Sequence, residues 1–249
     1  MSYITRHQRD SLPYVLPLLF AAAAASITVL VWQRRVTTGK GSKRSGKARA
    51  ASLRAAEPVV GGTDVQEATE GTGPLIHRRY EVELPDRAMS ADIVMRLIQL
   101  HLTELAPAAL ARFEKSVGSD VVFRVGDEYE ISMFGPWNGT VRVVRMEPDS
   151  FTLVTLDGHP EAGHITFSVH DDELAPGSLR VVIESWARAR DPLVEAAYST
   201  FKIGKMAQTE VWITFLQRLS ELAGVTTRPQ VRITTEALPE PASAAKSDE

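Results

Sequence analysis

The sequence predicts an α+β protein in which an N-terminal transmembrane helix precedes a curved antiparallel sheet of about six or seven strands, with one long C-terminal helix across it. Three observations predict this architecture. An uncharged run of membrane-spanning length occupies residues 12–32. Short strand-like segments separated by turn residues follow one another between residues 121 and 187. An amphipathic stretch at 191–223 is long enough to cross a whole sheet.

Charge is divided unevenly along the 249 residues, although the formal net charge is only −3. Residues 34–54 carry eight Lys or Arg and no acidic residue, whereas residues 74–224 carry 15 Lys or Arg against 22 Asp or Glu. A domain with this excess of acid repels phosphate backbones, so we expect no nucleic-acid partner. The chain has no cysteine, which excludes disulfides, thiolate zinc sites and cysteine nucleophiles.

The run from Leu12 to Trp32 contains no charged residue. About 20 residues at ~1.5 Å each span the hydrocarbon core of a bilayer, so 12–32 is predicted to be a transmembrane helix after a short flank at 1–11. A signal peptide cleaved within Ala21–Ser26 is the alternative, but the apolar run continues beyond the alanines. Because the basic residues follow the helix, the positive-inside rule predicts a cell-membrane protein whose C-terminal domain lies in the cytoplasm.

Two segments lack the apolar residues that a packed core requires. Residues 33–73 are predicted to be a basic flexible linker and residues 225–249 a disordered tail, which leaves one domain at 74–224. The basic stretch at 34–54 can bind anionic lipid headgroups. Alternatively it serves only as the topology signal, which alone accounts for it.

The hydrophobic pattern of the domain predicts its elements in order. Residues 79–84 alternate as a strand. Ser90 is predicted to cap a helix that ends near Leu105, and a short helix is expected after Pro107. The last helix, at 191–223, starts at an Asp-Pro pair.

Six strand-like runs lie between these helices. Asn138-Gly139 is a type I′ hairpin signal. The short connections between runs indicate an antiparallel meander, because parallel strands need long crossovers. The runs are approximately 121–125, 128–134, 140–146, 151–156, 163–170 and 178–187.

The segment from Thr155 to Phe167 reads TLDGHPEAGHITF. With the element order, it resembles a family of bacterial and plant proteins that is defined only as a domain of unknown function, in which Thr-Leu leads into Gly-His-Pro-Glu-x-Gly. The element order resembles the START-like (SRPBCC) superfamily, within which the motif is similar to that of this family, and the likeness covers about residues 80–222. The resemblance implies a helix-grip fold with an internal cavity, often for an apolar ligand, and no established reaction. The matching positions are Gly158, His159, Pro160, Glu161 and Gly163.

This motif supplies the candidate polar residues. His159 and Glu161 are the candidate catalytic acid and base, and His159 is also a candidate ligand contact. With His164 they form a set that can bind a divalent metal, but a turn shaped by its glycines and proline explains the pattern better. We therefore predict no metal site and no cofactor. The family carries an acidic pair where this chain has His164 and Ile165, so chemistry by those acids is not expected here.

Gln208 and Gly204 lie in the apolar stripe of the last helix and are candidate ligand contacts. A buried amide left unpaired costs ~1–3 kcal/mol, so Gln208 needs backbone, water or the polar end of a ligand as a partner. Gly204 either leaves room for a cavity or permits close helix–sheet contact.

Four further residues are candidates to line the space under that helix. They share strand faces that point toward the predicted core, and the alternative for each is a plain core position. They are Tyr129, Ile131, Met133 and Phe167.

Three functions remain open from the sequence. The leading hypothesis is a non-catalytic, membrane-tethered domain that binds an apolar or lipid-like small molecule between sheet and helix. The second is an enzyme, such as a cyclase or hydrolase, that uses His159 and Glu161. The third is a protein-interaction module without a small ligand at the inner membrane face.

Overall fold

The computed structural model describes residues 36–40, 62–85, 89–133, 137–201 and 203–238, with side chains at all of these except 36–40 and 197–207. In this part of the chain nine strands form one sheet, in the order β1-β9-β2-β8-β7-β6-β5-β4-β3. The strands are β1 (Val36–Lys40), β2 (Thr72–Leu84), β3 (Ala111–Val117), β4 (Glu128–Met133), β5 (Gly139–Glu147), β6 (Ser150–Thr155), β7 (Glu161–Asp171), β8 (Leu179–Ala189) and β9 (Val231–Leu238). The helices are α3 (Ala91–Leu100), α4 (Leu102–Leu105), α5 (Pro192–Phe201) and α6 (Ile203–Leu222).

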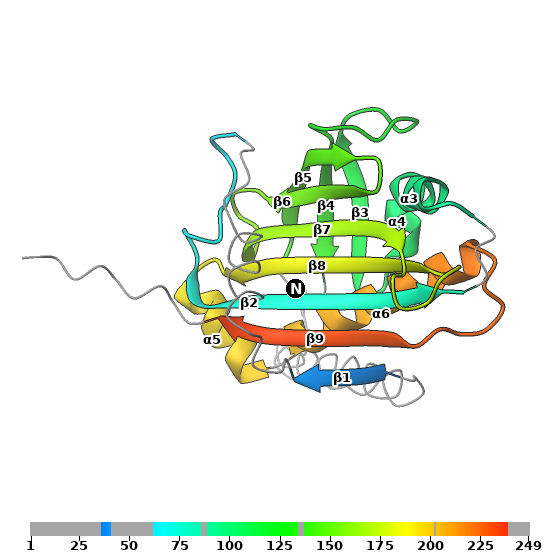
Figure 1. The fold of residues 1–249 in the computed structure, drawn as a ribbon. Helices are drawn as coiled ribbons and strands as arrows, with labels where there is room; N and C mark the ends of the chain where they lie inside the picture. Colours follow the sequence, from blue (N-terminus) through cyan, green and yellow to red (C-terminus); the bar gives the residue numbers. More distant parts are fainter. Residues whose placement is uncertain (1–35, 41–61, 86–88, 134–136, 202, 239–249) are drawn as a thin grey trace, which may run out of the picture.

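Neighbouring strands pair antiparallel throughout, except that β1 runs parallel to β9. Strands β4 to β8 form the predicted meander, β3 extends it at one edge, and β2 inserts between β8 and β9 (Figure 1). The α+β class and the antiparallel sheet are confirmed. The predicted number of six or seven strands is too low, because two strands lie in segments predicted to be linker and tail.

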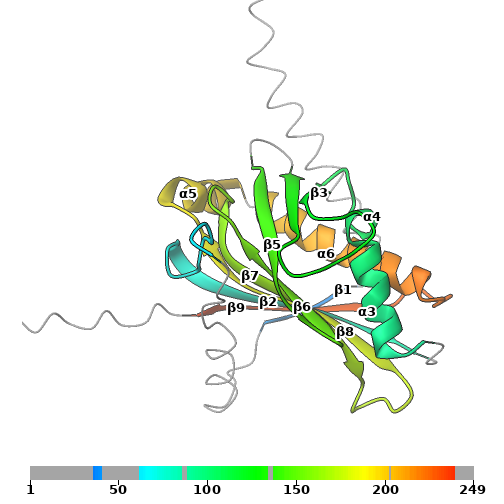
Figure 2. The ribbon, with the colours of Figure 1, turned by 90° about the horizontal axis from the view of Figure 1, so that it is seen from above.

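The helices pack on one face of the sheet, called here the inner face (Figure 2). The sheet twists, which brings β3 close to α6. The ring centroids of Phe113 on β3 and Trp212 on α6 lie 6.3 Å apart. Trp212 and Phe215 both contact Phe167 on β7, each with 5.6 Å between ring centroids. The predicted last helix at 191–223 therefore corresponds to α5 and α6, and α6 covers the core.

Two predicted elements are wrong. The segment after Pro107 is a turn followed by strand β3, because its Ala111 and Phe113 alternate into the core while Arg112 points out. The predicted strand at 121–125 is a loop. Its valines have strand propensity but no partner strand. Lys115 holds the segment by donating hydrogen bonds of 2.8 Å to the backbone carbonyl groups of Ser119, just before it, and Val122, within it.

The predicted tight hairpin at Asn138-Gly139 is also wrong. Gly139 is the first residue of β5 and pairs with Ile131, so the connection from β4 is longer than two residues. Gly139 is required for a different reason, because a Cβ atom there would overlap the imidazole ring of His159.

The predicted boundaries of the domain need correction at both ends. Thr72 and Gly73, assigned to the linker, belong to β2, and Val65 forms a β-bridge with Leu156. Residues 231–238, assigned to a disordered tail, form β9 and pair with β2. Among the described residues, no helix combines the length and apolarity needed to cross a membrane. The predicted flank at 1–11 and membrane segment at 12–32 lie outside the described residues.

Candidate functional site

A polar cluster of three residues lies between the sheet and α6, with Arg78 buried and Glu161 and Gln208 partly exposed. Nη1 of Arg78 donates a hydrogen bond of 2.6 Å to Oε1 of Gln208, and Nε2 of Gln208 donates one of 2.8 Å to Oε2 of Glu161. Nη1 of Arg78 also lies 3.5 Å from Oε1 of Glu161. The amide of Gln208 thus bridges a guanidinium and a carboxylate, and both of its polar ends have partners.

The strand periodicity explains how this cluster forms. Arg78 precedes Tyr80 and Val82 on β2, and these alternate residues face the core. Glu161 is the first residue of β7 and lies six residues before Phe167, so the two side chains point to the same, inner face. Gln208 lies one helical turn before Trp212 on α6, so both face the sheet. Three elements that are far apart in the sequence therefore each contribute one polar side chain to the same cluster.

Three more polar side chains are buried on β2, β8 and α6. Tyr80 is fully buried and Ser185 is 4% exposed, and Ser185 pairs with Arg78 in the register of β2 and β8. Trp212 is 7% exposed. Within the described part of the chain, Tyr80 Oη, Ser185 Oγ and Trp212 Nε1 make no hydrogen bond.

The charge of Arg78 affects the pKa of Tyr80. Burial raises the pKa of Tyr80, and the nearby Arg78 opposes that rise. The hydroxyl of Thr209 lies close enough to favour the ionised form, although no hydrogen bond of normal geometry joins it to Tyr80. Tyr80 is therefore a neutral, buried hydroxyl beside the guanidinium.

The turn at Gly158–Gly163 is held by Gln66, from the segment predicted to be linker. Nε2 of Gln66 donates hydrogen bonds of 2.8 Å to the backbone oxygens of both His159 and Glu161. Its Oε1 accepts one from the backbone N–H of Gly158 at 3.3 Å. Gln66 is 6% exposed, so this clamp is buried and fixes the backbone that carries Glu161.

His159 is buried in the turn rather than joined to the polar cluster. Its Nδ1 accepts a hydrogen bond of 3.0 Å from the backbone N–H of Glu161. Its ring packs beneath Gly139 on β5. The structure therefore brings Glu161 and Gln208 together, whereas the imidazole of His159 is occupied by the backbone.

This burial predicts a dependence of stability on pH. Burial lowers the pKa of His159 from the ordinary value of 6.5, against the opposing charge of Glu161. Because the unfolded chain then binds the proton more readily, the free energy of unfolding falls as the pH drops below about 6.5, by up to ~1.4 kcal/mol per pH unit. We expect His159→Gln to remove this slope, measured by chemical denaturation of both chains between about pH 7.5 and 5.5. Equal slopes in the two chains would contradict a buried, neutral His159.

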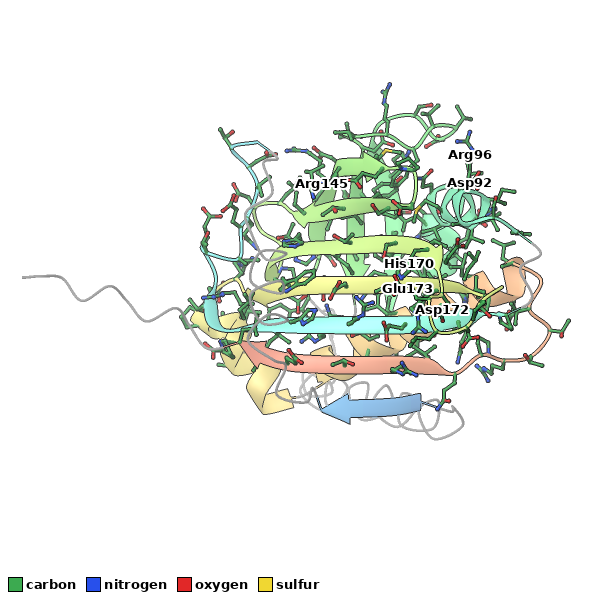
Figure 3. The ribbon with its side chains drawn as sticks, in the orientation of Figure 1. Asp92, Arg96, Arg145, His170, Asp172 and Glu173 are labelled. Carbon is green, nitrogen blue, oxygen red and sulfur yellow. The ribbon has the colours of Figure 1, made fainter. Side chains whose placement is uncertain are left out.

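His164 lies on the outer face of the sheet, opposite the helices, as the strand alternation predicts. Its ring stacks on Trp186 with 5.4 Å between centroids, and Trp186 stacks on His77 at 4.6 Å. His77 Nε2 lies 2.6 Å from a carboxylate oxygen of Glu184. His170, at the far end of β7, follows the same outward alternation (Figure 3). His164 is thus separated by the sheet from Glu161.

The other candidate ligand residues are distributed over the core. Phe167 is fully buried and stacks on Phe151 with 4.7 Å between ring centroids. Tyr129 and Ile131 are buried on the inner face of β4, and Met133 packs partly buried at its end. Gly204 falls within α6, but its surroundings lie outside the described side chains. No group of three or more His, Asp or Glu among the described residues is arranged to bind a metal ion.

Two residues of the site escaped sequence reasoning. Arg78 lies just before the predicted strand at 79–84, and extending the alternation of Tyr80, Val82 and Leu84 by one step places it on the inner face. Gln66 gives no comparable signal, because it lies in a polar segment without periodicity.

A known protein family matches the part of the chain that carries two residues of the cluster. Residues 104–219 match the family described as "Domain of unknown function (DUF1990)". The matched residues include Glu161 and Gln208, and they exclude Arg78, Gln66 and β9. None of the curated proteins matches this chain.

Several solved structures are similar to this chain at low identity. The hypothetical protein jhp0584 from Helicobacter pylori aligns with a TM-score of 0.42 and 10% identity over 58% of this chain and 85% of that chain. Norcoclaurine synthase from Thalictrum flavum, in complex with dopamine and hydroxybenzaldehyde, aligns with a TM-score of 0.41 and 14% identity over 69% of this chain and 98% of that chain. Protein Ms6760 from Mycobacterium smegmatis aligns with a TM-score of 0.38 and 16% identity over 66% of this chain and 99% of that chain.

Proposed function

We propose that this chain is a membrane-tethered, START-like helix-grip domain that binds an apolar or lipid-like small molecule between its sheet and α6. The observation that carries the proposal is the cluster of Arg78, Glu161 and Gln208, in which the guanidinium of Arg78 is buried at the edge of a largely apolar core. A ligand with a long apolar body and a polar end matches this combination of surroundings.

The energetics of the cluster support a role in binding. Taking a guanidinium and a carboxylate out of water is unfavourable, and replacing such a pair by apolar residues of similar volume is often neutral or stabilising. The aromatic core beside the cluster, with Phe167, Trp212 and Phe215 in mutual contact, does not need these charges in order to pack. A buried polar group that packing does not require is a candidate for ligand recognition.

The N-terminal sequence supports the membrane tether. The uncharged run at 12–32 is long enough to span a bilayer, and the basic residues at 34–54 favour a cytoplasmic domain close to anionic headgroups. A domain held at the membrane surface meets molecules that partition into lipid at high local concentration.

The test is to identify the small molecules that co-purify with the full chain. We expect the wild-type chain, extracted in mild detergent, to retain a stoichiometric apolar molecule that mass spectrometry detects after organic extraction. Ser185→Leu places a larger side chain beside Arg78 on the inner face and breaks no hydrogen bond with a described residue. Overpacking of roughly 1–3 kcal/mol should lower the bound amount about tenfold.

Ser168→Leu is the matched control, because the same change then falls on the outer face of the neighbouring strand β7. Both variants keep residues 12–32, so lipid that adheres to that segment is equal in the two preparations. Hydrogen exchange of β2 and β8 reports whether each variant is folded. A folded wild-type chain that carries no more apolar small molecule than folded Ser185→Leu would overturn the proposal.

A further inference from the structure

We infer that the ligand carries a carboxylate head and that Arg78 binds it from the edge formed by Nε and Nη2. This inference rests on the proposed function and specifies the chemistry of the ligand's polar end.

The hydrogen bonds of Arg78 leave that edge free. A guanidinium has five N–H donors in a planar fork. Both contacts of Arg78 with described residues, to Gln208 and Glu161, use Nη1. The Nε and Nη2 groups therefore make no hydrogen bond within the described part of the chain, although Arg78 is only 5% exposed. Two parallel N–H groups of a guanidinium match the two oxygens of a carboxylate.

Two hydroxyl groups next to Arg78 can contribute to binding the same head. Ser185 lies opposite Arg78 in the sheet, the charge of Arg78 acts on Tyr80, and both hydroxyl groups can donate or accept a hydrogen bond. Both are buried; Ser185 Oγ makes no hydrogen bond with the described residues, and Tyr80 Oη has only the nearby hydroxyl of Thr209. Each buried donor that stays unpaired costs ~1–3 kcal/mol. An acceptor-rich head satisfies this set, and a head that only donates does not.

Glu161 and Gln208 act as positioning residues in this arrangement. Oε2 of Glu161 accepts the hydrogen bond from Gln208, and Oε1 of Gln208 accepts the one from Arg78 Nη1. This chain of contacts fixes one edge of the guanidinium and turns the other edge toward a ligand. A guanidinium can bind carboxylates at two edges at once. At the edge of Nε and Nη2 an amine head would meet only donors, and an alcohol would satisfy fewer of these donors than a carboxylate.

Three photoreactive probes of one chain length test the head group. They are a long-chain carboxylic acid, the primary alcohol and the primary amine, each with a diazirine at the same carbon. Each probe is added to the full chain in phosphatidylcholine vesicles, and labelling is mapped by mass spectrometry to peptides of β7, β8 and α6, normalised to the probe found in the vesicles. We expect the acid to label these peptides about tenfold more than the alcohol or the amine, the effect of one charge-assisted bidentate contact.

Arg78→Met should reduce labelling by the acid about tenfold, toward the level of the alcohol. Arg79→Met is the matched control, because Arg79 is the next residue of β2 and lies on the outer face, where it pairs with Glu184 at 3.0 Å. It should leave labelling unchanged. The comparison of the three probes uses only the wild-type chain, so it decides the question even if Arg78→Met does not fold.

The outcomes separate the two proposals. If no probe labels these peptides in the wild-type chain, both the proposed function and the carboxylate head are wrong. If the alcohol or the amine labels them as strongly as the acid, the carboxylate head is wrong while the proposed function stands. Equal loss in folded Arg78→Met and Arg79→Met would also overturn the role of Arg78.

Discussion

A chain that ends at Gly224 is expected to lose its folded state, although this boundary matches the end of the domain predicted from the sequence. The truncation removes β9, whose Val231, Ile233 and Leu238 are buried. Burial of an aliphatic side chain contributes roughly 1.5–3 kcal/mol, so the three contribute about 5–9 kcal/mol together. Since domains of this kind are stable by only about 5–15 kcal/mol, the loss approaches the whole free energy of unfolding.

Removal of β9 also exposes the backbone of β2. Between Leu75 and Glu81, β2 pairs with β9 along one edge, and the same strand carries Arg78 and Tyr80 of the polar cluster. Exposed strand edges promote association between chains. We therefore expect the truncated chain to aggregate or to unfold without a cooperative transition, followed by tryptophan fluorescence during heating.

A chain that ends at Leu238 is the control for this truncation. It keeps all of β9 and removes only the residues after it. It should unfold at the same temperature as the full chain. If the chain ending at Gly224 unfolds as cooperatively and at the same temperature as this control, β9 is not part of the core.

The sheet could be predicted from the sequence wherever a strand carries its own alternating pattern. β4 to β8 each place several apolar residues on the inner face, and their predicted positions agree with the structure to within a few residues. β9 offers only Val231 and Ile233 as consecutive inward positions, followed by threonines and a glutamate. Its stability depends on pairing with β2, which is distant in the sequence and leaves no local signal.

The candidate site could be predicted only in part, for the same reason. Gln208 is noticeable because it interrupts an apolar stripe, and Glu161 because it belongs to a compact motif. The contact between them depends on how α6 crosses β7, which no local pattern contains. The predicted catalytic pair was His159 with Glu161, whereas the structure gives Glu161 the partners Arg78 and Gln208. A compact turn suggests that its polar residues contact one another, but the alternation of β7 carries the Glu161 side chain to the inner face.

The second large effect is expected at Gly163, where Gly163→Ala should destabilise the fold by about 3–5 kcal/mol. Its φ of +149° is unfavourable for any residue with a Cβ atom. A Cβ atom would also overlap the carbonyl oxygen of Trp186 and lie 2.9 Å from Cα of Ala187, both backbone atoms of the paired strand β8. Strands β7 and β8 would have to separate where Thr155 Oγ1 accepts a hydrogen bond of 2.9 Å from the Gly163 N–H.

Gly158→Ala isolates the conformational part of this effect. Gly158 has a φ of +90°, but a Cβ atom there would meet no other atom within 4 Å. The change should therefore cost only about 1–2 kcal/mol, the strain of a left-handed backbone without a clash. Chemical denaturation of the two variants measures the difference, which we expect to exceed about 1 kcal/mol. Equal losses would mean that β7 and β8 move apart without penalty at Gly163, and the second glycine of the motif would then be required for its backbone conformation alone.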